Sequence, residues 1–109
     1  MPYLRFNGFT KEELSPLIPR IIQDFARTAE IDEDKVKVEF RPTGRLTNSP
    51  RSLEILMFQR SQDKHDRIAA VLYAILESGG FEDTHIFYKI LSQQLYYRNG
   101  KPLSGYVIC

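Results

Sequence analysis

The second residue of the chain is a proline, and this position offers a chemistry that an internal proline lacks. When the initiator Met1 is removed, as is usual before a small residue or a proline, Pro2 becomes a free secondary amine. A terminal amine has an ordinary pKa of about 7.7–8.0, and partial burial or a nearby cation lowers it because both disfavour the ammonium form. Pro2 is therefore a candidate general base near neutral pH. The alternative is a proline that only opens a strand, where it donates nothing to the sheet.

Two charged residues lie within or next to an apolar segment, where a charge has to be explained. Arg60 follows the apolar segment 53–59 and precedes a helix, so it can bind a substrate carboxylate with help from the helix N-terminus. It can equally be a solvent-exposed arginine or a partner of Glu54 or Asp63. Glu54 interrupts the apolar segment and is costly to bury unless it is paired. We expect Glu54 to form a structural or intersubunit salt bridge rather than to act as a general acid.

The histidines and the single cysteine do not suggest a metal site or a nucleophile. His65 falls on the polar side of the second predicted helix, so we expect it at the surface. No second His, Cys or carboxylate stands at metal-ligand spacing from His85, and no phosphate loop, nucleophile elbow or dinucleotide fingerprint occurs. We therefore expect no metal and no cofactor. Cys109 permits no internal disulfide and suits a reducing cytosol, so we expect a cytoplasmic protein.

The composition is that of an ordinary soluble protein. The 109 residues suit one domain spanning 1–109, with 42% hydrophobic and 27% charged residues. A formal net charge of +1 gives no general electrostatic argument for binding nucleic acid or an anionic membrane. No apolar run approaches the roughly 18–20 residues of a membrane span, and the start of the chain has no signal-peptide pattern.

The first predicted helix is interrupted. Thr10 and Glu13 have the spacing of a capping box, in which each side chain satisfies a free backbone N–H. Two prolines follow, and an interior proline removes a backbone donor. We expect a loose first turn over 11–14 and a regular helix from Ser15 to near Glu30, with Pro16 in its tolerated first position.

Periodicity predicts the remaining elements. A second helix is capped by Ser61 or Asp63 and ended by Gly79-Gly80. Asn99-Gly100 predicts the tight turn of a hairpin over 95–103, and we expect the last six residues to be a loose tail. Four segments are predicted to be strands, the second with one apolar and one charged face and the third central in the sheet: residues 3–6, 35–41, 53–59 and 84–90.

The element order is β-α-β twice, over about 1–42 and 52–91, followed by the hairpin. It fits two α+β architectures. In a ferredoxin-like sandwich, strands two and three are hairpin neighbours. In the other, two parallel β-α-β units form a mixed sheet in the order 2-1-3-4, and the chain crosses roughly 10 Å between strands two and three. The ten-residue loop 42–51 favours the second architecture because most hairpin loops are shorter.

Three stretches resemble a known family. Pro2-Tyr3-Leu4-Arg5-Phe6 resembles its N-terminus, Leu53 to Phe58 with the Arg60 that follows resembles its central strand and helix start, and Tyr96 to Gly100 resembles its terminal hairpin. The family is a small, uncharacterised bacterial one grouped with the tautomerase superfamily, which includes 4-oxalocrotonate tautomerase and macrophage migration inhibitory factor. The resemblance implies a mixed four-stranded sheet with both helices on one face and assembly as a homotrimer. It also implies a pocket around the N-terminal proline, between neighbouring subunits.

The resemblance carries over the functional residues only in part. Pro2 matches the catalytic proline. Lys37 lies on the strand where 4-oxalocrotonate tautomerase has an arginine that binds its acidic substrate, and His85 falls near the pocket tyrosine of the inhibitory factor. The other substrate-recognition residues of these proteins are not retained. The candidate site is thus Pro2 as the base, with Lys37, Arg60 and His85 as substrate-binding residues.

Three functional hypotheses remain open. The first is a cofactor-independent tautomerase in which Pro2 moves a proton on a small keto–enol or dienol carboxylic acid, while Lys37 or Arg60 holds the carboxylate. The second is a non-enzymatic assembly or binding protein of the same fold, which retention of Met1 would favour because an acylated nitrogen has no basic lone pair. The third is a ferredoxin-like nucleic-acid module, against which the near-zero net charge argues.

Overall fold

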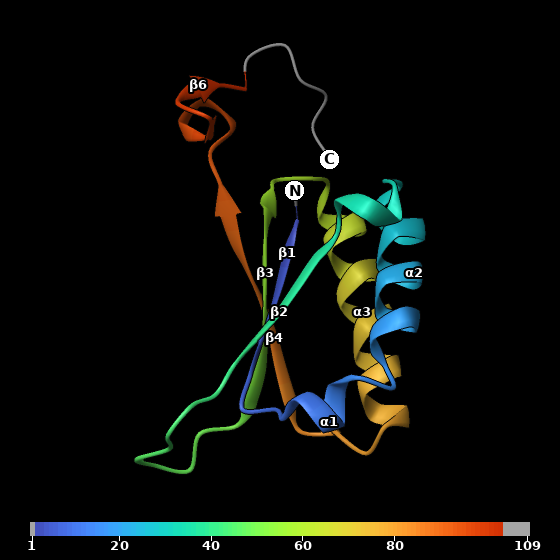
Figure 1. Cartoon of the computed structure of the whole chain (residues 1–109). Helices are drawn as coiled ribbons and strands as arrows, with labels where there is room; N and C mark the ends of the chain where they lie inside the picture. Colours follow the sequence, from blue (N-terminus) through green and yellow to red (C-terminus); the bar gives the residue numbers. More distant parts are fainter. Residues whose placement is uncertain (1, 104–109) are drawn as a thin grey trace.

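The computed structural model describes residues 2–103, which form a sheet layer and a helix layer (Figure 1). The sheet order is β2-β1-β3-β4, with β1 parallel to β2, β1 antiparallel to β3, and β3 parallel to β4. This is the predicted 2-1-3-4 order, so the ferredoxin-like alternative is wrong. The strands are β1 (Tyr3–Asn7), β2 (Lys37–Arg41), β3 (Arg51–Phe58) and β4 (Thr84–Leu91).

Both long helices cover one face of the sheet, and the other face carries no helix (Figure 1). The helices are α1 (Lys11–Leu14), α2 (Ile18–Ala29) and α3 (Gln62–Ser78). Alternation along β3 sends Leu53, Ile55 and Met57 into the core between the layers, where each is fully buried. On β1, Leu4 pairs with Ile55 and also faces the helices. The uncovered face of the sheet is called the open face below.

The first helix begins later than the sequence predicts. The capping box is present: the Thr10 hydroxyl accepts from the Glu13 N–H at 3.1 Å, and the Glu13 carboxylate accepts from the Thr10 N–H at 2.8 Å. The regular helix α2 then starts at Ile18 rather than Ser15, after a turn over 15–17. A start at Ser15 would have placed Pro19 where the helix needs a donor. A start at Ile18 places Pro19 in the first turn, where its N–H would have no helical partner.

The remaining predicted elements are present with small shifts. A short 3-10 turn, η1 (Glu33–Lys35), precedes β2, which therefore starts two residues later than predicted. Ser61 is the N-cap of α3 and accepts from the Lys64 N–H at 3.2 Å. A second 3-10 turn, η2 (Gln93–Leu95), leads into the terminal hairpin of β5 (Tyr97–Arg98) and β6 (Lys101–Pro102).

The hairpin turn has the backbone that its sequence predicts. Asn99 has φ 53° and Gly100 has φ 76°, and positive φ at both central residues is the requirement of a type I′ turn. The predicted loose tail lies outside the described residues. Within residues 2–103, no helix is both long and apolar enough to cross a membrane. No group of three acidic, His or Cys side chains in that range could hold a metal ion.

Candidate functional site

Pro2 is buried and directly precedes β1, at the end of the sheet where β3 ends, since Tyr3 pairs with Leu56. In Figure 1, α3 starts at this same end of the sheet. Its carbonyl accepts a hydrogen bond from the Lys37 N–H at 3.0 Å, which extends the β1–β2 pairing by one residue. The side chain is fully buried.

Lys37 lies next to Pro2, but its ammonium group has a partner of its own. It is the first residue of β2 and pairs with Tyr3 across the strands. Its Nζ donates to the Asp34 carbonyl at 3.1 Å, within the same chain segment, and the side chain is exposed. Lys37 therefore contacts Pro2 through its backbone, whereas its ammonium group is bound to the Asp34 carbonyl.

Arg60 bridges the two long helices at the same end of the sheet. Its Nη2 donates to the carbonyl of Ala29, the last residue of α2, at 3.2 Å. Its backbone N–H donates to His65 Nε2 at 2.9 Å. Neither partner suggested by the sequence is used, because Asp63 pairs with Arg67 at 3.1 Å and Glu54 pairs elsewhere. Arg60 Nη1 is buried and has no hydrogen-bond partner among the described residues.

The expectation that His65 lies at the surface is wrong. The residue is only 8% exposed, and its ring contacts the Tyr88 ring at 4.4 Å between centroids. The Tyr88 hydroxyl donates to the His65 carbonyl at 2.8 Å. Burial, and then the positive charge of Arg60, lower the pKa of His65, while Asp66 opposes the shift. Burial also raises the pKa of the Tyr88 phenol.

The helical pattern missed His65 because its ring turns back along the helix. A wheel projection places the residue on the polar side, yet the first turn of α3 lies over the end of the sheet, where Tyr88 of β4 points toward the helices. The sequence did contain one signal. A histidine four residues after a serine N-cap can reach back to the N–H that precedes the cap, as His65 does to Arg60.

His85 lies at the opposite end of the sheet from Pro2. It is opposite Ser52 on β3, and Ser52 is opposite Asn7, the last residue of β1. Asn7 is five positions along the strand from Pro2, which is roughly 16 Å at the usual rise per residue. One chain therefore gathers Pro2, Lys37 and Arg60 at one end and leaves His85 at the other.

The model of the family described as Domain of unknown function (DUF1904) matches residues 1–102. The chain belongs to the DUF1904 family. This confirms the resemblance to an uncharacterised family that the three stretches indicated. No curated protein matches the sequence.

Solved structures place this DUF1904 chain in the tautomerase fold. A protein of unknown function from Vibrio cholerae aligns with a TM-score of 0.85 at 22% identity, covering 94% of this chain and 87% of the other. A DUF1904 protein from Sebaldella termitidis aligns with a TM-score of 0.83 at 23% identity, covering 92% and 97%. A fused 4-oxalocrotonate tautomerase, described as an asymmetric trimer, aligns with a TM-score of 0.75 at 15% identity, covering 92% and 94%.

Macrophage migration inhibitory factors and malonate semialdehyde decarboxylase share the fold as well. The fold implied by the sequence resemblance, a mixed four-stranded sheet with two long helices and a terminal hairpin, is therefore confirmed.

Glu54 lies on the open face of the DUF1904 sheet, where it is 5% exposed. Lys89 Nζ lies 2.8 Å from one carboxylate oxygen, and Asn7 Nδ2 donates to the other at 2.7 Å. Arg41 is 4.0 Å away. The hydrogen bond from Lys89, and then that from Asn7, hold the pKa of the Glu54 carboxyl below its usual range. As predicted, Glu54 is in a salt bridge, and the bridge forms within one chain.

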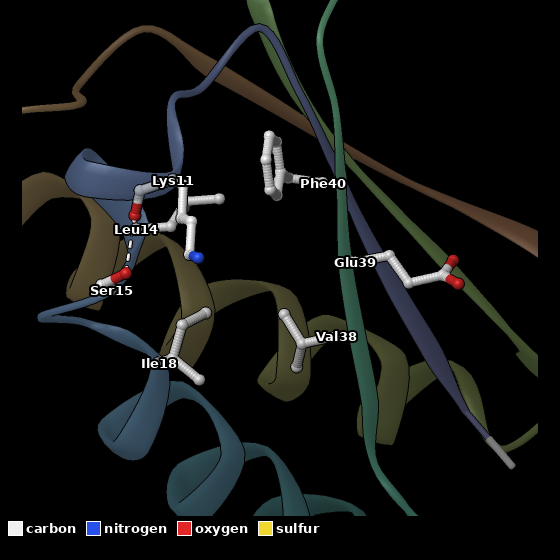
Figure 2. Close-up of a pocket in the computed structure, with 7 residues that line it drawn as sticks. All are labelled: Lys11, Leu14, Ser15, Ile18, Val38, Glu39 and Phe40. Carbon is white, nitrogen blue, oxygen red and sulfur yellow. Dashed lines mark hydrogen bonds between the residues drawn. The ribbon is translucent and has the colours of Figure 1, made fainter.

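A hollow of about 220 Å³ lies at the other end of the helix layer, between α1, the start of α2 and β2 (Figure 2). The side chains of Leu14, Ile18 and Val38 make it largely apolar, and the Glu39 carboxylate points away from it. It contains none of the residues that the sequence predicts for the site. It therefore adds nothing to the cluster around Pro2.

Proposed function

We propose that this DUF1904 protein is a cofactor-independent tautomerase, an isomerase in which Pro2 is the general base. Its substrate is a small keto–enol or dienol carboxylic acid. The observation that carries the proposal is the burial of Pro2 at the end of the sheet where Lys37 and Arg60 also lie, in a fold shared with 4-oxalocrotonate tautomerase. Because burial and nearby positive charge both lower the pKa of an amine, Pro2 freed of Met1 would be neutral near pH 7.

In the proposed reaction the secondary amine removes a proton from the carbon next to the keto group. The electron pair of that C–H bond becomes the carbon–carbon double bond of an enolate, and the protonated amine returns the proton to the oxygen. Lys37 or Arg60 holds the carboxylate and stabilises the charge that develops on the enolate oxygen. No cofactor takes part in this scheme, and we propose the cytoplasm as its location because the one cysteine suits a reducing compartment.

We further propose that the protein works as a homotrimer. Support comes from the trimer named in the description of the related 4-oxalocrotonate tautomerase structure and from the place of His85. Within one chain His85 is at the far end of the sheet from Pro2, so it can contribute only to the site of a neighbouring subunit. The open face, which carries the half-exposed Phe87, is available for such contacts.

The test is to compare Pro2→Ala with the unchanged protein on a panel of small α-keto acids, following the ultraviolet absorbance of the enol. Intact mass must first show that Met1 is absent from both proteins. General-base catalysis contributes about 100-fold or more, so turnover in Pro2→Ala should fall at least that far. Pro50→Ala, in the exposed loop before β3, is the control and should keep full turnover.

Unchanged turnover in Pro2→Ala would overturn the proline mechanism. A mass that retains Met1 would also overturn it, and would favour the alternative of a non-enzymatic assembly or binding protein of this fold.

A further inference from the structure

Two buried hydrogen-bond donors at the start of α3 lack an acceptor among the residues described here: Arg60 Nη1 and His65 Nδ1. The tautomer of His65 follows from its other nitrogen. Because Nε2 accepts from the Arg60 N–H at 2.9 Å, the neutral ring must carry its proton on Nδ1. A buried donor without a partner is destabilising, so two such donors on residues that contact each other point to a missing acceptor.

Other atoms of the two side chains make contacts that fix the Arg60 guanidinium and the His65 ring, and these contacts do not use Arg60 Nη1 or His65 Nδ1. The second nitrogen of the Arg60 guanidinium is bound to the Ala29 carbonyl at 3.2 Å. The His65 ring is fixed by the Arg60 N–H and by the ring of Tyr88.

The acidic side chains around this point are already paired. Glu30 lies 2.6 Å from Lys64 Nζ, Asp63 pairs with Arg67, and Asp66 accepts from the Gln62 amide at 2.9 Å. These three carboxylates already have partners, and a ligand could supply the acceptor that the two donors lack. An anion suits the place, because one donor is cationic and the N-terminus of the 17-residue helix α3 adds partial positive charge.

We propose that Arg60 Nη1 and His65 Nδ1 together bind the carboxylate of the substrate. The inference deepens the proposed function, on which it rests only for the choice of a carboxylate. It assigns the carboxylate to Arg60 rather than Lys37, whose Nζ is exposed and bound to the Asp34 carbonyl. It also makes His65, which the sequence placed at the surface, a substrate-binding residue.

The direct test uses oxamate, a small keto-acid analogue without a C–H bond that Pro2 could ionise. Protein labelled with ¹⁵N at histidine is titrated with oxamate, and the side-chain nitrogen signals are followed by NMR. We expect a saturable shift of the His65 Nδ1 signal. The absence of any shift at saturating oxamate would overturn the inference.

Two substitutions of His65 distinguish the contribution of its Nε2 acceptor from that of its Nδ1 donor. In His65→Gln the amide oxygen can stand where Nε2 stands, so the bond to the Arg60 N–H is kept while the Nδ1 donor is lost. A lost hydrogen bond to a charged group corresponds to about tenfold or more in affinity, so oxamate should bind His65→Gln at least that much more weakly. In His65→Asn the amide nitrogen can replace Nδ1, and binding should recover in part. Wild-type affinity in His65→Gln would contradict the proposal.

Arginine and lysine variants complete the experiment. Arg60→Met should abolish oxamate binding, whereas Arg67→Gln, an exposed arginine on the same helix, should leave it unchanged. Loss of binding in Lys37→Met but not in Arg60→Met would overturn the assignment. The titration is repeated in Pro2→Ala: binding there supports the carboxylate site even if Pro2 is not the base. Turnover that depends on Pro2, without oxamate binding through Arg60 and His65, refutes this inference alone.

Discussion

At the scale of single residues, Glu54 illustrates how a buried carboxylate is kept on the central strand of the sheet. The residue sits on the central strand β3 with its two oxygens facing Lys89 and Asn7. An unpaired charge in this place would be strongly destabilising. Lys89 comes from β4 and Asn7 from β1. The Glu54 carboxylate on β3 therefore links three neighbouring strands.

Replacing Glu54 with Gln should lower the free energy of unfolding by about 1–2 kcal/mol, because a charged hydrogen bond is lost next to a half-exposed lysine. Urea denaturation measures the change. Glu39→Gln is the matched control: Glu39 also pairs with an arginine, Arg5, at 2.8 Å, but is half exposed. Its substitution should cost less than about 1 kcal/mol. Equal losses in the two variants would show that burial of Glu54 does not strengthen its pairing.

The lowered pKa of His65 predicts a loss of stability on mild acidification. The ordinary pKa of 6.5 applies to the unfolded chain, and burial places the native value below it. Between the two values the unfolded chain binds more protons than the native one, so stability rises with pH across this range. The contribution is complete above the unfolded value and is lost as the pH falls through the native value.

Melting temperatures measured from about pH 7.5 to pH 5 should therefore fall more steeply for the unchanged protein than for His65→Gln. Glu30 and Glu54 do not interfere, since their pKa values are lowered from 4.5 and they titrate at more acidic pH. Parallel curves for the two proteins would show that His65 does not titrate in the expected range.

At the scale of elements, the sequence correctly predicted the helix caps and the hairpin turn, because each is determined by residues close together in the chain. The capping box at Thr10, the serine cap of α3 and the Asn99-Gly100 turn depend on residues within four positions of one another, and all three are present. The start of α2 was predicted three residues too early because two prolines competed for the first turn. The helix starts where Pro19, and not Pro16, falls in its first turn.

Ser61→Ala should lower the free energy of unfolding by about 1 kcal/mol, because the Lys64 N–H loses its acceptor at the start of α3. Ser49→Ala, in the exposed loop between β2 and β3, is the comparison and should change stability by less than about 0.5 kcal/mol. Thermal or urea unfolding of the two variants provides the measurement. An unchanged free energy of unfolding in Ser61→Ala would mean that water satisfies the Lys64 N–H as well as the serine hydroxyl does.

At the scale of the whole molecule, the sheet order was predictable but the complete site was not. The ten-residue loop after β2 favoured the crossing that the structure contains. Strand order then places Pro2 and Arg60 at the same end of the sheet. The buried position of His65 depends on contacts with Arg60 and Tyr88, which lie outside α3, and no periodicity within α3 could reveal it.

The proposed homotrimer predicts a role for Phe87, which is 43% exposed and lies opposite Glu54 on the open face. Phe87→Lys should convert a trimer to monomers, because a charge is unfavourable in the core of an interface. The lysine would face Glu54, so the fold of the subunit should persist. Light scattering after size exclusion gives the mass. Leu46→Lys, at a fully exposed loop position, should leave the mass unchanged; a monomeric unchanged protein would refute the proposal.

The place of β1 in the sheet sets an order of events during synthesis. The first strand to leave the ribosome is an interior strand, bordered by β2 and β3. Its first partner begins 34 residues later in the chain, at Lys37, and its second at Arg51. At a translation rate of about 5–20 residues per second, the apolar residues Leu4 and Phe6 are synthesised seconds before β2 or β3. The apolar side chains of β1 thus stay without their sheet partners for longer than those of any other strand of the four.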